Sequence, residues 1–193
     1  MSSSALPIDF WFDFISPYGY LASLRIDALA ARHGRTVRWH PLLLGVTVVK
    51  VMGLKPLMQT PLKRDYVPRE IARYTRRHGV VLARALDAPP MNPLPAARAF
   101  AWLLQQAPAA DAKRFAQAAL HAVWAEGLDL GDAAAVQACG HRAGLDAGTM
   151  DRATQDPQAA TLLRAEVDAA VARGVFGVDK FELLEDWLAT GGW

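Results

Sequence analysis

The chain has 193 residues, a size that suits one domain or one domain carrying an insertion. Just over half of the residues are hydrophobic (52%), so a core of this length needs no disulfide or metal to be stable. The formal net charge of +2 is smaller than the excess typical of nucleic-acid binders. Basic residues gather only between Lys50 and Arg84, which suits either a solvated helix face or a field that attracts a small anion.

The chain has one cysteine, Cys139, in an Ala-rich stretch that predicts a buried, inert thiol. A single cysteine excludes an intramolecular disulfide, a CxxC redox pair and a cysteine-based zinc site, so no metal is expected. No apolar stretch is long enough to span a bilayer. We therefore expect a cytoplasmic protein without a membrane or nucleic-acid partner.

The first fifth of the chain predicts a parallel βαβ unit. Ile8–Phe14 is short, aromatic and β-favouring, which indicates a buried strand. Ser16 followed by Pro17 is typical of a helix start, and Tyr18–His33 carries helical periodicity. Thr36–Leu44 then predicts a second strand, and strand–helix–strand closes most simply with the strands parallel.

The middle of the chain predicts helices only. From Val46 to about Gly174 no segment has a convincing strand pattern, and a Pro-rich connector separates an Arg-rich helix from the later ones. A large all-helical insertion inside an α/β framework is therefore expected. The predicted helices, each bounded by cap-type residues, Gly or Pro, are Val67–Gly79, Ala96–Gln106, Asp111–Glu126, Asp132–Ala143, Asp146–Asp151, Pro157–Arg173 and a terminal Glu182–Ala189.

Ser16 is the candidate reactive residue because it lies where the first strand ends and a helix begins. Ligands bind outside the carboxyl ends of strands in open α/β sheets, and a helix start favours an anion. A serine there can donate to a thiolate supplied by a ligand, although Ser-Pro is also a common structural cap. A serine hydrolase is disfavoured because Ile15-Ser16-Pro17 is no nucleophile elbow. The five histidines show no pairing motif and are interpreted as structural.

The segment Asp9-Phe10-Trp11-Phe12-Asp13-Phe14-Ile15-Ser16-Pro17-Tyr18-Gly19-Tyr20-Leu21-Ala22 resembles the opening of the 2-hydroxychromene-2-carboxylate isomerases and the related kappa-class glutathione transferases. The resemblance extends over essentially the whole chain. It implies the DsbA-like thioredoxin fold, with residues 1–46 and 174–193 forming the thioredoxin-like domain and residues 47–173 the helical insertion domain. It also implies glutathione as cofactor and a homodimer.

The resemblance assigns roles to individual residues. Ser16 matches the family serine that stabilises the glutathione thiolate. Lys50, after the second strand, matches a lysine suited to a glutathione carboxylate, but Leu54 stands where the family has an asparagine. Met91 and Asn92, after the Pro-rich connector, match a further ligand-binding position. A surface lysine and a turn residue before proline are the alternative interpretations of Lys50 and Asn92.

The C-terminal part departs from the family pattern. The family has Gly-Val-Phe-Gly-Val-Pro-Thr-Phe, then a β-hairpin, then an aspartate that meets the glutamyl amine of glutathione. Here Val178 runs directly into Asp179, as if roughly fifteen residues were lost and the C-terminal hairpin with them. Two explanations are open: a segment missing from the numbered chain, in which case Val178 and Asp179 both line the glutathione site, or a true internal deletion that damages it.

The predicted function is a glutathione-dependent cis–trans isomerase that acts on a small aromatic carboxylate of the chromene carboxylate or benzylidenepyruvate type. A nucleophile helps such a reaction because addition makes a double bond temporarily single. Two alternatives remain: a kappa-class-like glutathione transferase or peroxidase, and a non-catalytic binding protein if the deletion is real. A disulfide oxidoreductase is disfavoured, since Ser16-Pro17-Tyr18-Gly19 stands where two cysteines are needed.

Overall fold

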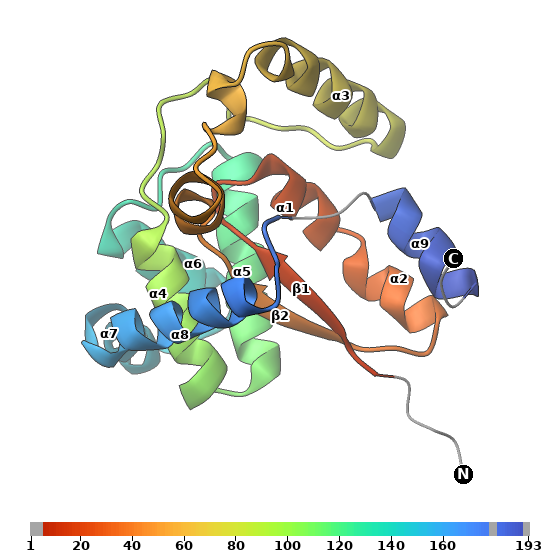
Figure 1. The fold of residues 1–193 in the computed structure, drawn as a ribbon. Helices are drawn as coiled ribbons and strands as arrows, with labels where there is room; N and C mark the ends of the chain where they lie inside the picture. The colour runs from red at the N-terminus through yellow and green to blue at the C-terminus, as the bar shows by residue number, and fades with distance from the viewer. Residues whose placement is uncertain (1–5, 178–180, 191–193) are drawn as a thin grey trace.

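The computed structural model covers all 193 residues and describes residues 6–177 and 181–190 (Figure 1). Strand β1 (Ile8–Phe12) pairs in parallel with β2 (Val37–Pro41), with Phe10 opposite Trp39. The predicted βαβ unit is therefore confirmed, with shorter strands. The last backbone hydrogen bond between the two segments is donated by the Leu42 N–H to the Phe12 carbonyl at 2.7 Å, just beyond the end of β2.

The single helix predicted over Tyr18–His33 is wrong in one respect: two helices occupy that span, α1 (Pro17–Ser23) and α2 (Ile26–Arg32). The break follows from local hydrogen bonding. Ser23 Oγ donates to the Tyr20 carbonyl at 2.6 Å, an interaction that competes with the helical backbone. Arg25 leaves helical geometry at φ −129°, and its side chain reaches across to Tyr74 on another helix.

The insertion is helical, as predicted. Within residues 46–177 the structure contains no strand. The turn of π-helix at Gly45–Val51 (η1) and the 3₁₀ turn at Leu57–Gln59 (η2) were not expected, because no amphipathic period marks them. The remaining helices are α3 (Lys63–His78), α4 (Leu94–Gln106), α5 (Ala109–Trp124), α6 (Ala133–Arg142), α7 (Ala147–Gln155), α8 (Gln158–Ala172) and α9 (Phe181–Thr190).

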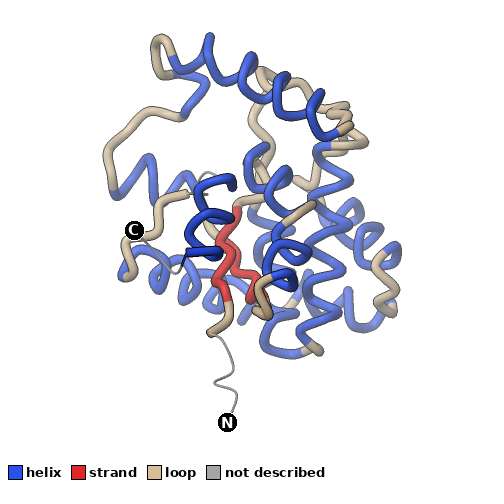
Figure 2. Tube along the Cα trace, turned by 90° about the vertical axis from the view of Figure 1, so that its right-hand side faces the viewer, coloured by secondary structure: helices blue, strands red, loops and turns tan. Residues whose placement is uncertain are grey.

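One hydrophobic cluster joins the sheet to the insertion. The ring of Phe12 on β1 lies 5.4 Å from the ring of Phe100 on α4, and both side chains are almost fully buried. Helices surround the two strands in Figure 2. The sequence-based boundary between a thioredoxin-like domain and an insertion domain stays a prediction; the two parts share a core.

The C-terminal helix α9 lies beside α2 (Figure 1). Arg32 pairs with Glu185, and the guanidinium of Arg35 lies 5.7 Å from the centre of the Trp187 ring. The idea of a segment missing from the numbered chain is wrong, because the full sequence runs unbroken from Val178 to Asp179. The described residues form a sheet of two strands. An internal deletion in the C-terminal part, relative to the family pattern, stays a prediction.

Candidate functional site

Ser16 lies at the carboxyl end of β1 and is the N-cap of α1. Its backbone is extended (φ −90°, ψ 116°), and its Oγ accepts a hydrogen bond from the Gly19 N–H at 3.1 Å. The side chain is nearly buried, at 7% exposure. Oγ is bonded as an acceptor, and no bond that it donates is found among the described residues. Its proton is therefore available to a ligand atom.

The start of α1 offers a ligand fewer free backbone N–H groups than the sequence suggested. Pro17 at the first helical position has no N–H, and the Gly19 N–H is already bonded to Ser16. A ligand anion beside Ser16 would consequently depend on the hydroxyl more than on the free end of this seven-residue helix.

Asp13, which the sequence alone did not single out, fixes the loop that carries Ser16. Its Oδ1 accepts from the Ile15 N–H at 3.2 Å and its Oδ2 from the Leu44 N–H at 2.8 Å. The carboxyl group thus joins the loop after β1 to the loop after β2. Burial raises the pKa of Asp13 to about 6, although the N–H groups of Leu44, Ile15 and Phe14 act in the opposite direction. The sequence signal that could have found it is the acidic residue set between Phe12 and Phe14 in a run that predicts a buried strand.

A second anchor comes from the insertion. Trp124 on α5 donates its indole N–H to the Phe14 carbonyl at 3.0 Å, in a buried position. Gly19 lets this loop fold close to the helix: a Cβ at this position would lie 3.3 Å from the Asp13 carbonyl oxygen. Loop and helix therefore fit together with little freedom, which gives Ser16 a fixed orientation.

Tyr18 connects the same helix to the Arg-rich helix α3. Its hydroxyl donates to Glu70 Oε2 at 2.5 Å. Burial and the neighbouring Glu70 carboxylate raise the pKa of the Tyr18 phenol, which stays protonated and a donor. Val67 and Ile71 are the buried residues of α3, so this helix rests on the rest of the molecule through a narrow contact.

The other predicted ligand residues do not join Ser16 in one bonded cluster. Lys50 lies on η1 with an exposed side chain and no ion-pair partner among the described residues. Met91 is buried, and its sulfur accepts from the Leu130 N–H at 3.2 Å. Asn92 Oδ1 accepts from the Leu94 N–H at 3.1 Å, which fits the turn interpretation. Val178 and Asp179 lie outside the described residues.

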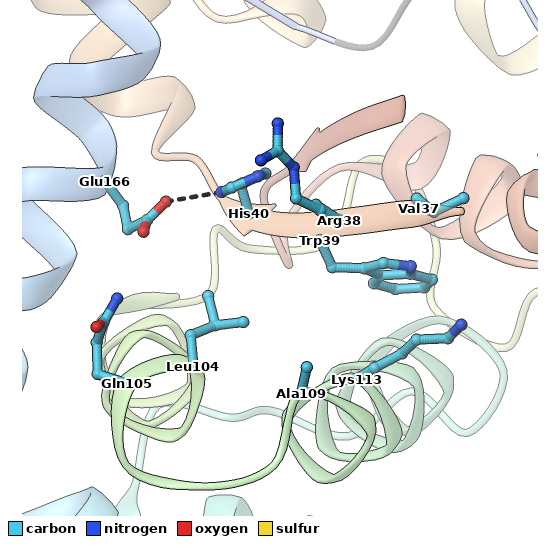
Figure 3. A pocket seen from close by; sticks show the side chains of 9 residues that line it. All are labelled: Val37, Arg38, Trp39, His40, Leu104, Gln105, Ala109, Lys113 and Glu166. Atoms are coloured by element: carbon cyan, nitrogen blue, oxygen red, sulfur yellow. Dashed lines mark hydrogen bonds and ion pairs between the residues drawn. The ribbon is translucent and has the colours of Figure 1, made fainter. Parts of the chain in front are cut away.

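A pocket of about 250 Å³ lies between β2 and the helices α4, α5 and α8, and none of the predicted site residues lines it (Figure 3). His40 Nδ1 lies 2.9 Å from Glu166 Oε2 across one wall, as the dashed line in Figure 3 shows. Trp39, Leu104 and Ala109 give the interior an apolar lining. Nothing in this pocket resembles an activated nucleophile.

Cys139 and the potential metal ligands among the described residues give no second reactive centre. Cys139 is fully buried, and burial raises the pKa of its thiol, as the sequence predicted for a structural cysteine. The described residues contain no group of three or more His, Cys, Asp or Glu side chains placed to hold a metal ion. They also contain no helix with the length and apolar character needed to cross a membrane.

Comparisons with known proteins agree with the opening motif. The family model of the DSBA-like thioredoxin domain matches residues 7–181. A 2-hydroxychromene-2-carboxylate isomerase from Sphingobium xenophagum is 28% identical over 204 residues, covering 94% of this chain and 97% of that protein. A solved 2-hydroxychromene-2-carboxylate isomerase superposes with a TM-score of 0.71 at 26% identity, over 88% of this chain and 81% of that one. The cytosolic disulfide reductase DsbM of Pseudomonas aeruginosa, solved with GSH, shares the fold (TM-score 0.61, 17% identity, 94% and 95% covered).

The alignment to the Sphingobium protein is longer than the 193-residue chain itself, so some of its positions have no counterpart here. That agrees with an internal deletion. The predicted fold class, a thioredoxin-like framework with a large helical insertion, is confirmed by the family match and the superposition. The chain belongs to the DSBA-like thioredoxin domain family, and the resemblance to 2-hydroxychromene-2-carboxylate isomerases is confirmed.

Proposed function

We propose that the protein is a glutathione-dependent cis–trans isomerase of an aromatic carboxylate of the chromene carboxylate or benzylidenepyruvate type. The observation that carries the proposal is Ser16: a nearly buried hydroxyl whose oxygen accepts from Gly19 while its proton has no acceptor among the described residues. The isomerase names of the relatives support an enzyme of this class. We also propose a cytoplasmic homodimer, as the family resemblance implies.

The residues of the chain fit glutathione at its sulfur end. Ser16 would donate its proton to the sulfur, favouring the thiolate over the thiol. Cys139 is buried and cannot supply the reactive sulfur, so the thiol has to come from a ligand. Glutathione, when bound, supplies a nucleophile that adds to a carbon conjugated with the substrate carbonyl and leaves again after the bond has rotated.

Lys50 is the residue of the chain that we assign to a carboxylate, either of glutathione or of the substrate. Its side chain is exposed and has no ion-pair partner in the described part of the chain, so its charge is not already neutralised there. Asn92 and Met91 fit a ligand less well, because each side chain already accepts a backbone hydrogen bond. We accordingly place the binding of the peptide part on Ser16 and Lys50 first.

The test follows the absorbance of a chromene carboxylate with protein and glutathione present together or singly. We expect isomerisation only with both. Ser16→Ala should lower the rate by about 100-fold or more, the usual loss when a donor to a developing or bound anion is removed. Ser23→Ala is a matched control, because Ser23 is also 7% exposed but donates to the Tyr20 carbonyl.

Equal losses in Ser16→Ala and Ser23→Ala would mean that Ser16 is only a structural cap, against the proposal. Two other results would replace it with one of the alternatives. Conjugation of glutathione to a generic electrophile, without isomerisation, indicates a kappa-class-like transferase. Calorimetric binding of glutathione without turnover of either substrate indicates a binding protein, which a shortened C-terminal region would favour.

A further inference from the structure

Exposed apolar side chains are concentrated in one short part of the insertion. Between residues 49 and 66 most of the large hydrophobic side chains face water, and the most exposed is Leu62 at 83%. We call this surface, together with its four cations, the basic apolar rim. It consists of Val49, Lys50, Val51, Met52, Leu54, Lys55, Leu57, Leu62, Lys63, Arg64 and Tyr66.

The rim begins on η1, which packs against the body of the protein through the buried Thr47, and continues onto η2 and α3. It follows η1, η2 and the start of α3, and η2 and α3 form the upper edge of the molecule in Figure 1; α3 remains at the top in the rotated view of Figure 2. Seven large hydrophobic side chains are more than a third exposed within eighteen residues of sequence, a density that single scattered surface residues do not give.

The charge on the rim is predominantly positive. No acidic residue occurs in the sequence between Asp27 and Asp65, so the apolar side chains from Val49 to Leu62 are interleaved with cations only. Asp65 itself lies 3.6 Å from Arg64, at the end of the segment. A surface that is both apolar and positive is complementary to a partner that is both apolar and negative.

Leu62 is held in a strained backbone. Its φ of 66° and ψ of −44° belong to a γ-turn of the rare, unfavourable type, closed by the Lys63 N–H bonding to the Pro61 carbonyl at 2.8 Å. It is the one non-glycine residue with positive φ in the described chain. A glycine would occupy this turn without strain, yet the position carries a leucine that points into water. Two unfavourable features at one residue favour a binding role for its side chain.

The composition of the rim separates two classes of partner. The centres of protein–protein interfaces are enriched in Trp, Tyr, Met and Arg, whereas lysine, leucine and valine are under-represented there. Apart from Met52, Arg64 and Tyr66, the rim is made of valine, leucine and lysine. Contact of the rim with itself in a two-fold dimer would also bring like charges together. Lysines that flank aliphatic side chains are typical of surfaces that lie on anionic lipid.

We propose that the basic apolar rim is a contact surface for an anionic lipid bilayer, with Leu62 entering the interface and Lys55, Lys63 and Arg64 lying at the level of the lipid phosphates. The sequence-based expectation of no membrane partner rested on the absence of a spanning segment, which such surface contact does not require. The proposal does not depend on the isomerase activity: Ser16 takes no part in it, and Lys50, although it lies in the rim, is not among the cations placed at the lipid phosphates.

The experiment measures co-sedimentation of the full chain with vesicles of phosphatidylcholine alone and of phosphatidylcholine mixed with phosphatidylglycerol. We expect binding only to the anionic vesicles, weakened by added salt. Leu62→Gly should reduce the partition coefficient by about tenfold or more, through the lost aliphatic contact. The same variant should unfold at a slightly higher temperature, because glycine relieves the turn. Charge reversal by Lys63→Glu with Arg64→Glu should reduce binding at least as much.

Two matched controls keep the test specific. Leu6→Gly removes a leucine of similar exposure (77%) outside the rim, and Arg98→Glu with Arg164→Glu reverses two exposed charges elsewhere. Both should bind as the unmodified protein does. Absence of binding to anionic vesicles, equal binding to neutral ones, or equal losses in the controls would overturn the proposal. So would a dimer in light scattering that Leu62→Gly converts to a monomer, since the rim would then be an interface between copies.

Discussion

The side chain of Asp13 accepts a 2.8 Å hydrogen bond from the backbone N–H of Leu44 and thereby ties the loop that ends β1 to the loop that ends β2. These two loops carry the residues on which the proposed activity depends. Ser16 follows on the first, and η1 with Lys50 follows on the second. The buried carboxyl group of Asp13 thus helps to set the relative position of the two segments that carry the proposed site.

The same carboxyl group predicts a pH dependence of stability. The pKa of Asp13 is raised from 3.8 to about 6, so between these values the folded state binds more protons than the unfolded state. The contribution of Asp13 is therefore most favourable below the lower value and falls as the pH rises through about 6. A shift of this size corresponds to about 3 kcal/mol. Asp13→Asn should remove this decrease when the free energy of unfolding is measured at pH values between 3.8 and about 6.

The check is the difference between the two denaturation series. If the unmodified protein and Asp13→Asn keep a constant difference in unfolding free energy from acid to neutral pH, the buried carboxyl does not titrate as described. At the low-pH end the protonated carboxyl, like an amide, has one carbonyl oxygen for the two N–H groups, so Asp13→Asn should match the unmodified protein most closely there.

Gly19→Ala should disturb the position of Ser16. The added Cβ would lie 3.3 Å from both the Asp13 carbonyl oxygen and Phe12 Cβ, and 3.4 Å from Ser16 Cβ, with backbone on one side that cannot yield. We expect the free energy of unfolding to fall by about 1–3 kcal/mol. The isomerisation rate should also fall under conditions in which the variant is still folded. Gly45→Ala is the control, because the methyl group that it adds would have no neighbour within 4 Å and its φ is not positive. Equal unfolding temperatures for the two variants would contradict the close fit.

Tyr18→Phe should loosen α3 from the body of the protein. It removes the 2.5 Å bond to Glu70 and leaves that carboxylate half-buried without the phenol donor. A cost of about 1–3 kcal/mol is expected for a bond to a charged group, together with faster amide exchange along α3. Tyr66→Phe removes a weaker, exposed contact to the same Glu70 (3.5 Å) and should change neither measurement. Similar exchange rates in both variants would show that Tyr18 does not hold the helix.

Gly140→Ala should destabilise the packing of α6 against α7. Its Cβ would lie 2.3 Å from the sulfur of Met150, a side chain that is fully buried and has little room to move. The expected cost is about 1–3 kcal/mol in thermal or chemical denaturation. Gly148→Ala on α7 offers the contrast: its nearest neighbour is an exposed aspartate oxygen at 3.3 Å, and helix propensity should give a gain of about 0.5–1 kcal/mol. A loss in both would point to a general intolerance of α6 and α7 to added bulk.

The sequence by itself determined most of the secondary-structure elements of this protein. The aromatic run Ile8–Phe14, the Ser16-Pro17 helix start and the helical periods from Ala96 onward predicted the elements, because neighbouring residues decide strand, cap and amphipathic helix. The opening motif also predicted the family. Element ends were less certain, as the break between α1 and α2 shows, since the contact of Arg25 with Tyr74 lies across the fold.

Tertiary structure alone decided what surrounds those elements. Asp13 joins two loops through hydrogen bonds to its buried carboxyl group, and Asn92 accepts a hydrogen bond within a turn. Both outcomes depend on which backbone N–H groups the fold brings close to the side chain. The exposure of Leu62 and its neighbours likewise follows from how η1, η2 and α3 leave the core. Sequence periodicity reports which residues prefer burial, whereas packing of distant segments determines which of them obtain it.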